Sequence, residues 1–324
     1  MRRNARKRAR NRVLLALGRV LFDRIGRLEP ETASRIGAAL GRLGYCFLGP
    51  ARRRVYEHLA LAFDEPAGSH RHRRIALAAF TNFAANAFEW IAWLPRGSKL
   101  AAASIREVRG MEHMVRARAA GRGALLVTAH FGLFEMMPAA LGREIKPAVV
   151  IGRKPADESF DAFVTENRAR MDVRTIPQSA AREILRVLKK GGVAGVLPDQ
   201  DIDKLPGIFV PFFGRDAWTP TGPASVSVMT GAPLVPLFIY REGPACHRIE
   251  IHEPIEDPGG TKEERVRALT EEINRRIEAV IRETPGHWAW FHERWQTTPE
   301  KLERRRKRRA RIAKQRRERE NGAS

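Results

Sequence analysis

The sequence predicts an α/β fold in which a mixed sheet is flanked by helices and preceded by a helical layer. From Ala124 onward, short apolar runs alternate with helical stretches, which is the rhythm of a sheet joined by crossover connections. Before residue 101 no strand-like alternation occurs. The 324 residues, 43% of them hydrophobic, suffice for one substantial core with a smaller helical part.

The N-terminal part has helical patterns divided by turns. Between residues 13 and 100 these patterns are separated by Gly49-Pro50, by residues 66–69 and by residues 95–97. We therefore assign residues 30–110 to a helical layer and 111–300 to the α/β part, which together form one domain, 30–300. Residues 1–29 are a basic, amphipathic segment, and residues 301–324 a basic tail.

The α/β part contains four apolar runs that we predict as strands: 124–128, 148–151, 193–197 and 234–240. Helices are expected at 134–143, 160–171 and 180–190, the last ending at Gly191-Gly192. A further helix follows Thr261, which has a capping-box glutamate at Glu264. Its apolar residues recur on one helical face: Val266, Leu269, Ile273, Ile277 and Ile281.

The net charge of +22 is concentrated in the two ends of the chain. Residues 1–12 hold seven Lys or Arg and no acid, and residues 301–324 hold twelve basic and three acidic residues. Only +6 remains for residues 13–300. Such blocks favour an anionic partner, whether nucleic acid, membrane lipid or an acidic protein, and the alternative is a solvated tail without a partner.

The apolar run Val13 to Gly18 is cut short by Arg19 and falls well below the ~20 apolar residues that span a bilayer. We interpret residues 1–29 as a membrane-surface helix, with packing on the body of the protein as the alternative. Cys46 and Cys246 lie far apart, so the sequence indicates neither a disulfide framework nor a thiolate metal site. A reducing cytoplasmic setting fits this usage.

His130 follows an apolar strand at its carboxyl end, where sheets of this kind place their binding crevices. Gly132 allows a tight turn, and Glu135 is expected to reach back and fix the tautomer of the imidazole, which leaves one ring nitrogen free to act as a general base. The alternative is a structural histidine. Neither a G-x-S-x-G elbow, a Walker loop nor an H-E-x-x-H zinc motif occurs, so direct attack by a substrate hydroxyl is favoured.

The segment His130 to Glu135 resembles the H-F-G-x-x-E form of the H-x-x-x-x-[DE] signature of the lipid A biosynthesis late acyltransferases, within the glycerolipid acyltransferase group. Further matches follow in the same order over roughly residues 30–298: Gly152-Arg153, Arg168-Ala169-Arg170, Pro198-Asp199-Gln200-Asp201, Phe209 to Gly214 with Thr219, Ala232 to Pro236, and His287 to Trp295. The ordered set is more specific than any one motif.

The resemblance implies transfer of a fatty acyl chain from acyl carrier protein to a hydroxyl of a lipid A precursor during lipopolysaccharide biosynthesis. It implies a peripheral enzyme at the cytoplasmic face of the bacterial inner membrane, with no cofactor or metal beyond the donor thioester. His130 is expected as the base, Glu135 as its orienting partner and Arg168 as the cation facing the oxyanion. The expected substrate-binding residues are Arg153, Asp199, Gln200, Phe212, Phe213 and Thr219.

Some of these residues have competing interpretations. Arg153, just beyond a predicted strand, suits phosphate or sugar but is also compatible with a plain surface cation. Asp199 is expected to hold an arginine or a substrate hydroxyl, or else to form a turn after Pro198. The phenylalanines could line an acyl groove or belong to the core. For Trp288, Trp290 and Trp295 with Arg294 we favour core packing.

The chain departs from the family pattern in three places. Its N-terminal apolar run is broken by charge, His58-Leu59 stands where the family often has Asn-Leu, and the Arg-rich tail lies outside the resemblance. The acceptor therefore has an alternative, a glycolipid such as a phosphatidylinositol mannoside. A nonspecific nucleic-acid-binding protein is a third hypothesis, but the tail lacks interleaved aromatic residues or a reading helix.

Overall fold

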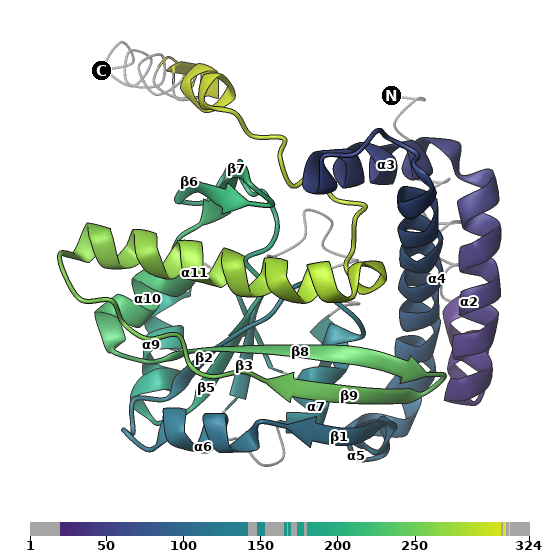
Figure 1. Ribbon diagram of the computed structural model, residues 1–324. Coiled ribbons are helices and arrows are strands. Elements are labelled where there is room, and N and C mark those ends of the chain that lie inside the picture. The colour runs from purple at the N-terminus through teal and green to yellow at the C-terminus, as the bar shows by residue number, and fades with distance from the viewer. Residues whose placement is uncertain are drawn as a thin grey trace, which may run out of the picture.

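The computed structural model describes residues 20–141, 148–152, 165, 166, 168, 169, 174–177, 180–305, 307, 308 and 311. Three helices, α2 (Pro30–Phe47), α3 (Gly49–Phe63) and α4 (His70–Trp93), form a layer beside the sheet, at the right of Figure 1. Ser69 caps α4 by accepting a hydrogen bond from the backbone N–H of His72. Short helical turns then lead to the first strand: η1 (Leu94–Arg96), α5 (Gly97–Ala101) and η2 (Ala102–Ser104).

The main sheet has seven strands in the order β1-β9-β8-β2-β5-β3-β4. Their bounds are β1 (Ile105–Arg109), β2 (Ala124–Val127), β3 (Ala148–Gly152), β4 (Thr175–Pro177), β5 (Val193–Val196), β8 (Leu234–Gly243) and β9 (Cys246–Ile251). β2 lies parallel to both β5 and β8, whereas β8 and β9 are antiparallel. The expected mixed α/β sheet with a helical N-terminal region is thereby confirmed.

The sheet is larger than the sequence predicted. β1 falls inside residues 30–110, which the sequence assigns to the helical layer. It was not predicted because it is a short edge strand with mostly exposed side chains, which gives no apolar run. A separate antiparallel pair, β6 (Gly207–Phe212) and β7 (Arg215–Pro220), was also not anticipated. Pro211 within β6 obscures a strand pattern and fits a two-stranded ribbon outside the main sheet.

The predicted helices appear with altered lengths. The segment 134–143 forms a 3₁₀ turn, η3 (Phe134–Met136), and the short α7 (Met137–Leu141), while 180–190 forms α9 (Ala181–Lys189). Most of 160–171 lies outside the described residues. The remaining helices are α6 (Met111–Arg118), α10 (Gly222–Thr230), α11 (Lys262–Glu283) and η4 (Pro285–His287), and α11 begins with the expected capping box at Thr261.

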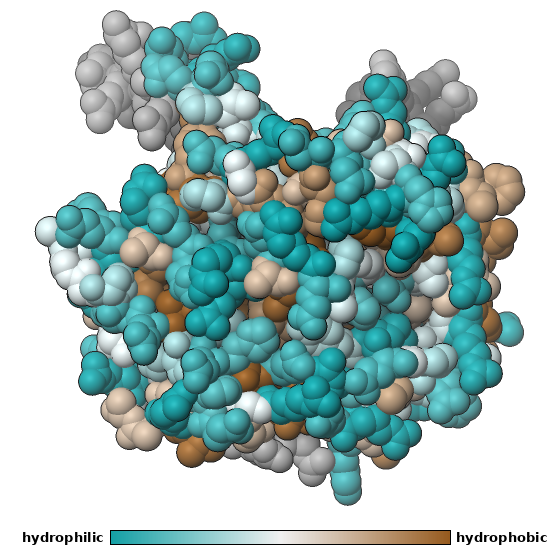
Figure 2. Space-filling model, viewed as in Figure 1, coloured by the Kyte–Doolittle hydropathy of each residue, from teal (hydrophilic) through white to brown (hydrophobic). Residues whose placement is uncertain are grey.

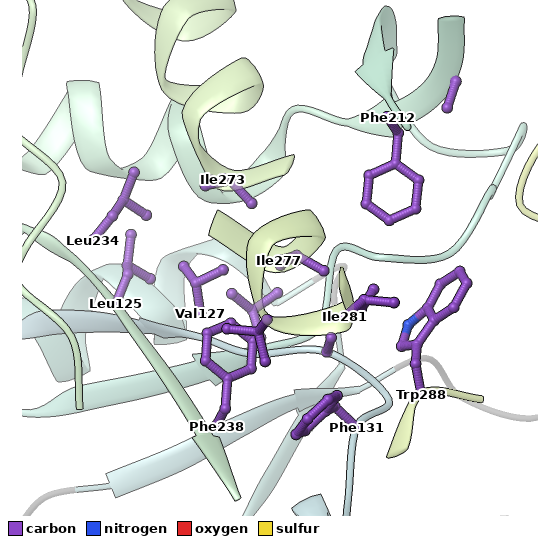
Figure 3. Packing of buried hydrophobic residues seen from close by; sticks show 14 of the residues in the cluster. Leu125, Val127, Phe131, Phe212, Leu234, Phe238, Ile273, Ile277, Ile281 and Trp288 are labelled. Carbon is purple, nitrogen blue, oxygen red and sulfur yellow. The ribbon is translucent and has the colours of Figure 1, made fainter. Parts of the chain in front are cut away.

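The core lies between α11 and the sheet. Figure 3 shows Ile273, Ile277 and Ile281 of α11 directed at strand residues that include Leu125 and Phe238. All five side chains are at most 2% exposed. Burial of this apolar surface fixes β2 beneath α11, and β2 carries the chain directly to His130.

α4 is a long helix that is rich in apolar residues. Together with its extension, His70–Ser104, it is long and apolar enough to cross a bilayer by length and composition alone. In the fold, however, its Glu89 is fully buried between Arg241 of β8 and His247 of β9. These contacts bind one face of α4 to the sheet.

Candidate active site

His130 lies at the carboxyl edge of the sheet, where the parallel strands β2 and β5 end side by side. Gly132 makes the turn beyond it with a φ of +57°, and a Cβ there would collide with the backbone carbonyl of Ile239 in β8. A left-handed glycine pressed against the sheet therefore turns the chain immediately after His130.

Asp199 binds His130 through both of its carboxylate oxygens. Oδ2 accepts a hydrogen bond from the His130 backbone N–H at 2.8 Å, and Oδ1 lies 2.8 Å from Nδ1 of the imidazole. The indole N–H of Trp288 donates to Oδ2 at 2.9 Å. A carboxylate at Nδ1 holds the proton on that nitrogen and leaves Nε2 as a proton acceptor.

Asp199 raises the pKa of His130, and His130 lowers the pKa of Asp199. Burial alone would lower the pKa of His130, but the attraction and hydrogen bond of Asp199 outweigh it and raise that pKa above its ordinary value. Burial would raise the pKa of Asp199, yet His130 holds it well below its usual range. The buried carboxylate stays ionised and favours a protonated imidazole once His130 accepts a proton.

Glu135 does not contact the imidazole, so the prediction that it orients His130 is wrong. Its carboxylate instead binds Arg168 in a bidentate pair, with Nε at 3.0 Å and Nη2 at 2.6 Å. The chain turns sharply between His130 and η3, which separates residues that are close in sequence. Asp199 orients the His130 imidazole instead, because Asp199 follows β5 and β5 is the immediate neighbour of β2 in the sheet.

Arg168 remains beside the site as a fixed cation. Burial would lower its pKa, but Glu135 raises it above the ordinary value, and Nη1 faces Gly152 at the end of β3. Its expected role toward an oxyanion stays a prediction. Arg153, the residue after β3, lies outside the described residues.

Gln200 lies within hydrogen-bond distance of Nε2, the acceptor nitrogen of His130. Its side-chain Nε2 lies 3.2 Å from Nε2 of the imidazole. Since Nδ1 carries the proton toward Asp199, the amide donates to Nε2. Gln200 therefore lies where a substrate hydroxyl must bind for His130 to deprotonate it.

A cavity of about 230 Å³ opens beside His130. It lies between α4, the turn after β2 and the segment after η4, and its lining is mainly apolar: Ala79, Phe83, Asn86, Ala87, Trp90, His130, Gly132, Leu133, Phe134, Glu135, His287, Trp288 and Ala289. The cavity matches an apolar ligand whose polar end reaches His130 and Glu135.

Phe212, Phe213 and Thr219 do not line this cavity. All three are buried, because the β6–β7 ribbon folds its inner face onto the core around α11. The structure thus places all three in the core, and their expected binding of substrate stays a prediction. Phe212 packs against Trp288 instead, and the Thr219 hydroxyl accepts a hydrogen bond from Arg294.

The aromatic block after η4 is core, as expected for Trp288 and Trp290, which are 1% and 0% exposed. Trp288 has a second role that the sequence did not reveal, the hydrogen bond to Asp199. Further along, Asp201 accepts hydrogen bonds from the backbone N–H and hydroxyl of Thr297. The loop that carries Asp199 is thus held by the segment 288–297.

His292 was not predicted as a site residue. Its ring centroid lies 6.1 Å from that of His130 and 4.7 Å from that of Trp288. Both ring nitrogens are shielded from solvent and have no hydrogen-bond partner among the described residues. Burial lowers the pKa of His292 to about 4, so a neutral imidazole lies beside the His130–Asp199 pair.

Within the part of the chain that the structure describes, no group of three His, Cys, Asp or Glu side chains is arranged to hold a metal ion. The chemistry that the described groups can perform is proton transfer at His130 Nε2, next to a fixed cation and an apolar cavity. That combination suits attack by a hydroxyl on an acyl donor.

The chain is similar to acyltransferases of lipid A and of related glycolipids. Two relatives from Escherichia coli strain K12 align over 82% of this chain: a lipid A biosynthesis lauroyltransferase at 29% identity over 86% of its length, and a lipid A biosynthesis palmitoleoyltransferase at 25% over 85%. A phosphatidylinositol mannoside acyltransferase of Mycobacterium tuberculosis is 26% identical over 61% of this chain and 62% of its own.

Among solved structures, the 1-acyl-sn-glycerophosphate acyltransferase of Thermotoga maritima is 17% identical with a TM-score of 0.37, covering 76% of this chain and 97% of that one. The model of the bacterial lipid A biosynthesis acyltransferases matches residues 3–297, a span that contains the whole His130 site. By that match the chain belongs to the bacterial lipid A biosynthesis acyltransferase family.

Proposed function

We propose that this acyltransferase moves a fatty acyl chain from acyl carrier protein to a hydroxyl of a lipid A precursor, with His130 as general base. The observation that carries the proposal is the His130–Asp199 pair, which leaves Nε2 as a proton acceptor at the edge of an apolar cavity. Family membership supports an acceptor that is lipid A or a related glycolipid.

In the proposed reaction the acceptor hydroxyl replaces the Gln200 amide at His130 Nε2. Nε2 removes the hydroxyl proton as the oxygen bonds to the thioester carbonyl carbon. When the tetrahedral intermediate collapses, the carbon–sulfur bond breaks, and the imidazolium returns its proton to the departing thiolate. General base catalysis of this kind contributes roughly 10²- to 10⁴-fold in rate.

Asp199 and Arg168 stabilise opposite charges in this scheme. Asp199 lies against the imidazole when it becomes positive. Arg168, held by Glu135, supplies the cation for the carbonyl oxygen as it becomes negative. Glu135 then acts as a positioning residue, because it fixes the guanidinium and does not reach the reacting atoms.

The cavity beside His130 is the proposed site of an acyl chain. Phe83 and Trp90 of α4 form one wall, and Leu133 and Phe134 form another. A chain bound there would have its thioester end at His130, so the depth of the cavity would limit the acyl length that is accepted.

The charge distribution supports the proposed partners and location. Acyl carrier protein is acidic and lipid A precursors are phosphorylated, so a basic surface speeds encounter with both. We place the protein peripherally at the cytoplasmic face of the inner membrane. Most of the N-terminal segment 1–29 lies outside the described residues, but Val20 and Leu21, which are described, are exposed.

An acyl donor and acceptor panel tests the proposal. The purified protein is incubated with acyl carrier protein or coenzyme A thioesters, and with a lipid A precursor or a phosphatidylinositol mannoside, and products are identified by mass spectrometry. We expect transfer from acyl carrier protein to the lipid A precursor, abolished in His130→Ala and retained in His70→Ala, an exposed histidine of α4. Transfer to the mannoside alone would overturn the proposed acceptor. A preference for coenzyme A thioesters would overturn the proposed donor, and an active His130→Ala variant would overturn the proposed mechanism.

A further inference from the structure

Helix α2 packs through small residues and leaves large apolar residues exposed on a flank. Its buried face is made of Ala33, Gly37 and Gly41. A Cβ on Gly37 would lie 2.6 Å from the Ala84 carbonyl, and one on Gly41 would collide with the Phe80 carbonyl. The glycines therefore allow α2 to approach α4 at backbone distance.

Four large apolar side chains follow one another along an exposed flank of α2, about a quarter turn from its glycine face, and we call them the outer stripe: Ile36, Leu40, Leu43 and Phe47. Their spacings of four, three and four residues place them on one side of an α-helix. They are 39%, 45%, 53% and 79% exposed. Leu48, which follows Phe47 at the end of α2, is also exposed, and brown to tan side chains occur at the right-hand edge of Figure 2, where α2 lies.

This arrangement differs from that of the usual amphipathic helix, because large apolar side chains of α2 keep much of their surface exposed. A helix on the surface of a water-soluble domain directs its large apolar residues at the core, because burial of each is worth about 1.5–3 kcal/mol. The closest contact with α4 is made by the glycine face, and Leu43 and Phe47 remain more than half exposed. An apolar phase outside the protein accounts for them.

The charges around the outer stripe complement an anionic surface. Arg35 and Arg42 are exposed on the neighbouring surface of α2, and neither forms an ion pair with another of the described residues. Glu31, in the first turn, is the only acidic residue of α2. The chain that leads into this layer carries seven basic residues and no acid in its first twelve positions.

We propose that the outer stripe docks the protein on an anionic lipid bilayer, with α2 lying in the interface and its arginines at the headgroups. The proposal deepens the proposed function by naming the surface that meets the membrane, and it rests on that function only for its biological purpose. A second copy of the chain is a poorer occupant, because two facing stripes would bring arginine flanks together with few carboxylates between them.

The docking places the cavity near the lipid. α2 packs directly on α4, which forms a wall of the cavity through Ala79, Phe83 and Trp90. Two packed helices lie about 8–10 Å apart between axes. A bilayer in contact with α2 is thus within one further helix of the cavity, so a lipid acceptor has a short path to His130.

Vesicle flotation tests the surface directly. The full-length protein is mixed with vesicles of phosphatidylethanolamine and phosphatidylglycerol, or of phosphatidylcholine alone. We expect Leu43→Glu with Phe47→Glu to reduce the partition coefficient roughly tenfold or more. The matched control is Val115→Glu with Met229→Glu, two residues on α6 and α10 that are 66% and 60% exposed and lie away from α2, and it should bind as the unmodified protein does.

The charge flank has its own test. Arg35→Gln with Arg42→Gln should weaken binding to the anionic vesicles roughly fivefold for each arginine, and leave binding to phosphatidylcholine unchanged. Added salt should remove the difference between this variant and the unmodified protein, because the contribution is electrostatic.

A natural cysteine reports the depth of α2. Cys46 is exposed beside Phe47, and it can carry an environment-sensitive dye in a Cys246→Ser background. We expect a blue shift on anionic vesicles and quenching by spin labels on the acyl chains. The same dye at Met229→Cys, with both natural cysteines replaced, should show neither effect.

The outcomes separate the possible occupants. Equal vesicle binding by the stripe variant and the control overturns the proposal, as does a stripe variant that only converts a dimer to a monomer in light scattering. Acyl transfer measured with detergent-dispersed substrates should be the same in the stripe variant and the unmodified protein. Loss of vesicle binding with transfer intact supports the docking surface, whereas absence of transfer in every protein is a failure of the proposed function alone.

Discussion

Asp199 accepts hydrogen bonds from both the backbone N–H and the imidazole of a single residue, His130, and so fixes the ring and its attachment at once. Replacement of this carboxylate is the most direct test of the pair. In Asp199→Asn the amide can present its NH₂ to Nδ1, which favours the tautomer that carries its proton on Nε2. By analogy with other buried His–Asp pairs, we expect kcat to fall by roughly 10³- to 10⁴-fold with little change in KM.

The control for this variant is Trp288→Phe, which removes one hydrogen bond to Asp199 and keeps the carboxylate. We expect a much smaller loss of kcat there. Steady-state kinetics on both proteins, with circular dichroism to verify folding, decide the matter. Equal losses in the two variants would mean that Asp199 serves packing only.

The pH dependence of kcat/KM should show an acid limb set by His130. The base must be neutral, and Asp199 raises the pKa of His130 above its ordinary value of 6.5, so activity is lost as pH falls through that raised pKa. Removal of the attraction in Asp199→Asn should move the limb to lower pH, even where the remaining rate is small. A limb that stays in place would show that Asp199 does not control the charge of His130.

Glu135→Gln should lower kcat without moving this limb as far. Glu135 binds Arg168, and it raises the pKa of His130 only as a minor contribution behind Asp199. Combined with Arg168→Gln, the loss should be strongly non-additive in a double-mutant cycle, because the two side chains act as one unit. Additive losses, or a limb displaced as far as in Asp199→Asn, would restore a direct contact between Glu135 and the imidazole.

Gly132→Ala should destabilise the fold as well as the site. A left-handed backbone costs a non-glycine residue about 1–2 kcal/mol, and the added Cβ also collides with the Ile239 carbonyl. Gly121→Ala is the matched control, since Gly121 has a φ of +68° with nothing within 4 Å of the added atom. Denaturant unfolding should show a clearly larger loss for Gly132→Ala, and similar losses in both variants would refute the close approach to β8.

His292→Phe should make the protein more tolerant of acid. The buried imidazole has a pKa of about 4, so between pH 6.5 and 4 the unfolded chain binds a proton that the folded chain does not. Stability therefore falls with pH across this window, by ~2–3 kcal/mol from this group, and the loss should be absent in the variant. Parallel unfolding curves at pH 7 and pH 4.5 measure it, and an unchanged pH dependence would disprove the neutral, unpaired state of His292.

The sequence predicted what depends on local pattern. Apolar runs located β2, β3, β5 and β8, and the capping box at Thr261 located the start of α11. It could not predict the partner of His130, because Asp199 is 69 residues away and comes close only through the pairing of β2 with β5. Glu135 was predicted as the partner because it lies only five residues after His130 in the sequence. The turn at Gly132 directs the chain so that Glu135 binds Arg168 instead.

The environment of the phenylalanines also depends on long-range contacts that a local sequence pattern does not reveal. A cluster such as Phe212 and Phe213 is compatible with a groove or with a core, and the choice depends on which way the β6–β7 ribbon folds. His292 was missed for a related reason: its position beside His130 results from the path of the chain after α11, for which no local signal exists.

Asp199 and Asp201 are bound by Trp288 and Thr297, which are synthesised much later than the two aspartates. His130 and Asp199 leave the ribosome long before the residues that hold their loop in place. A nascent chain that stops short of residue 288 has both members of the pair but lacks the indole and the threonine that fix them. The His130–Asp199 pair is therefore expected to be held in place only when nearly all of the family-matched length has been made.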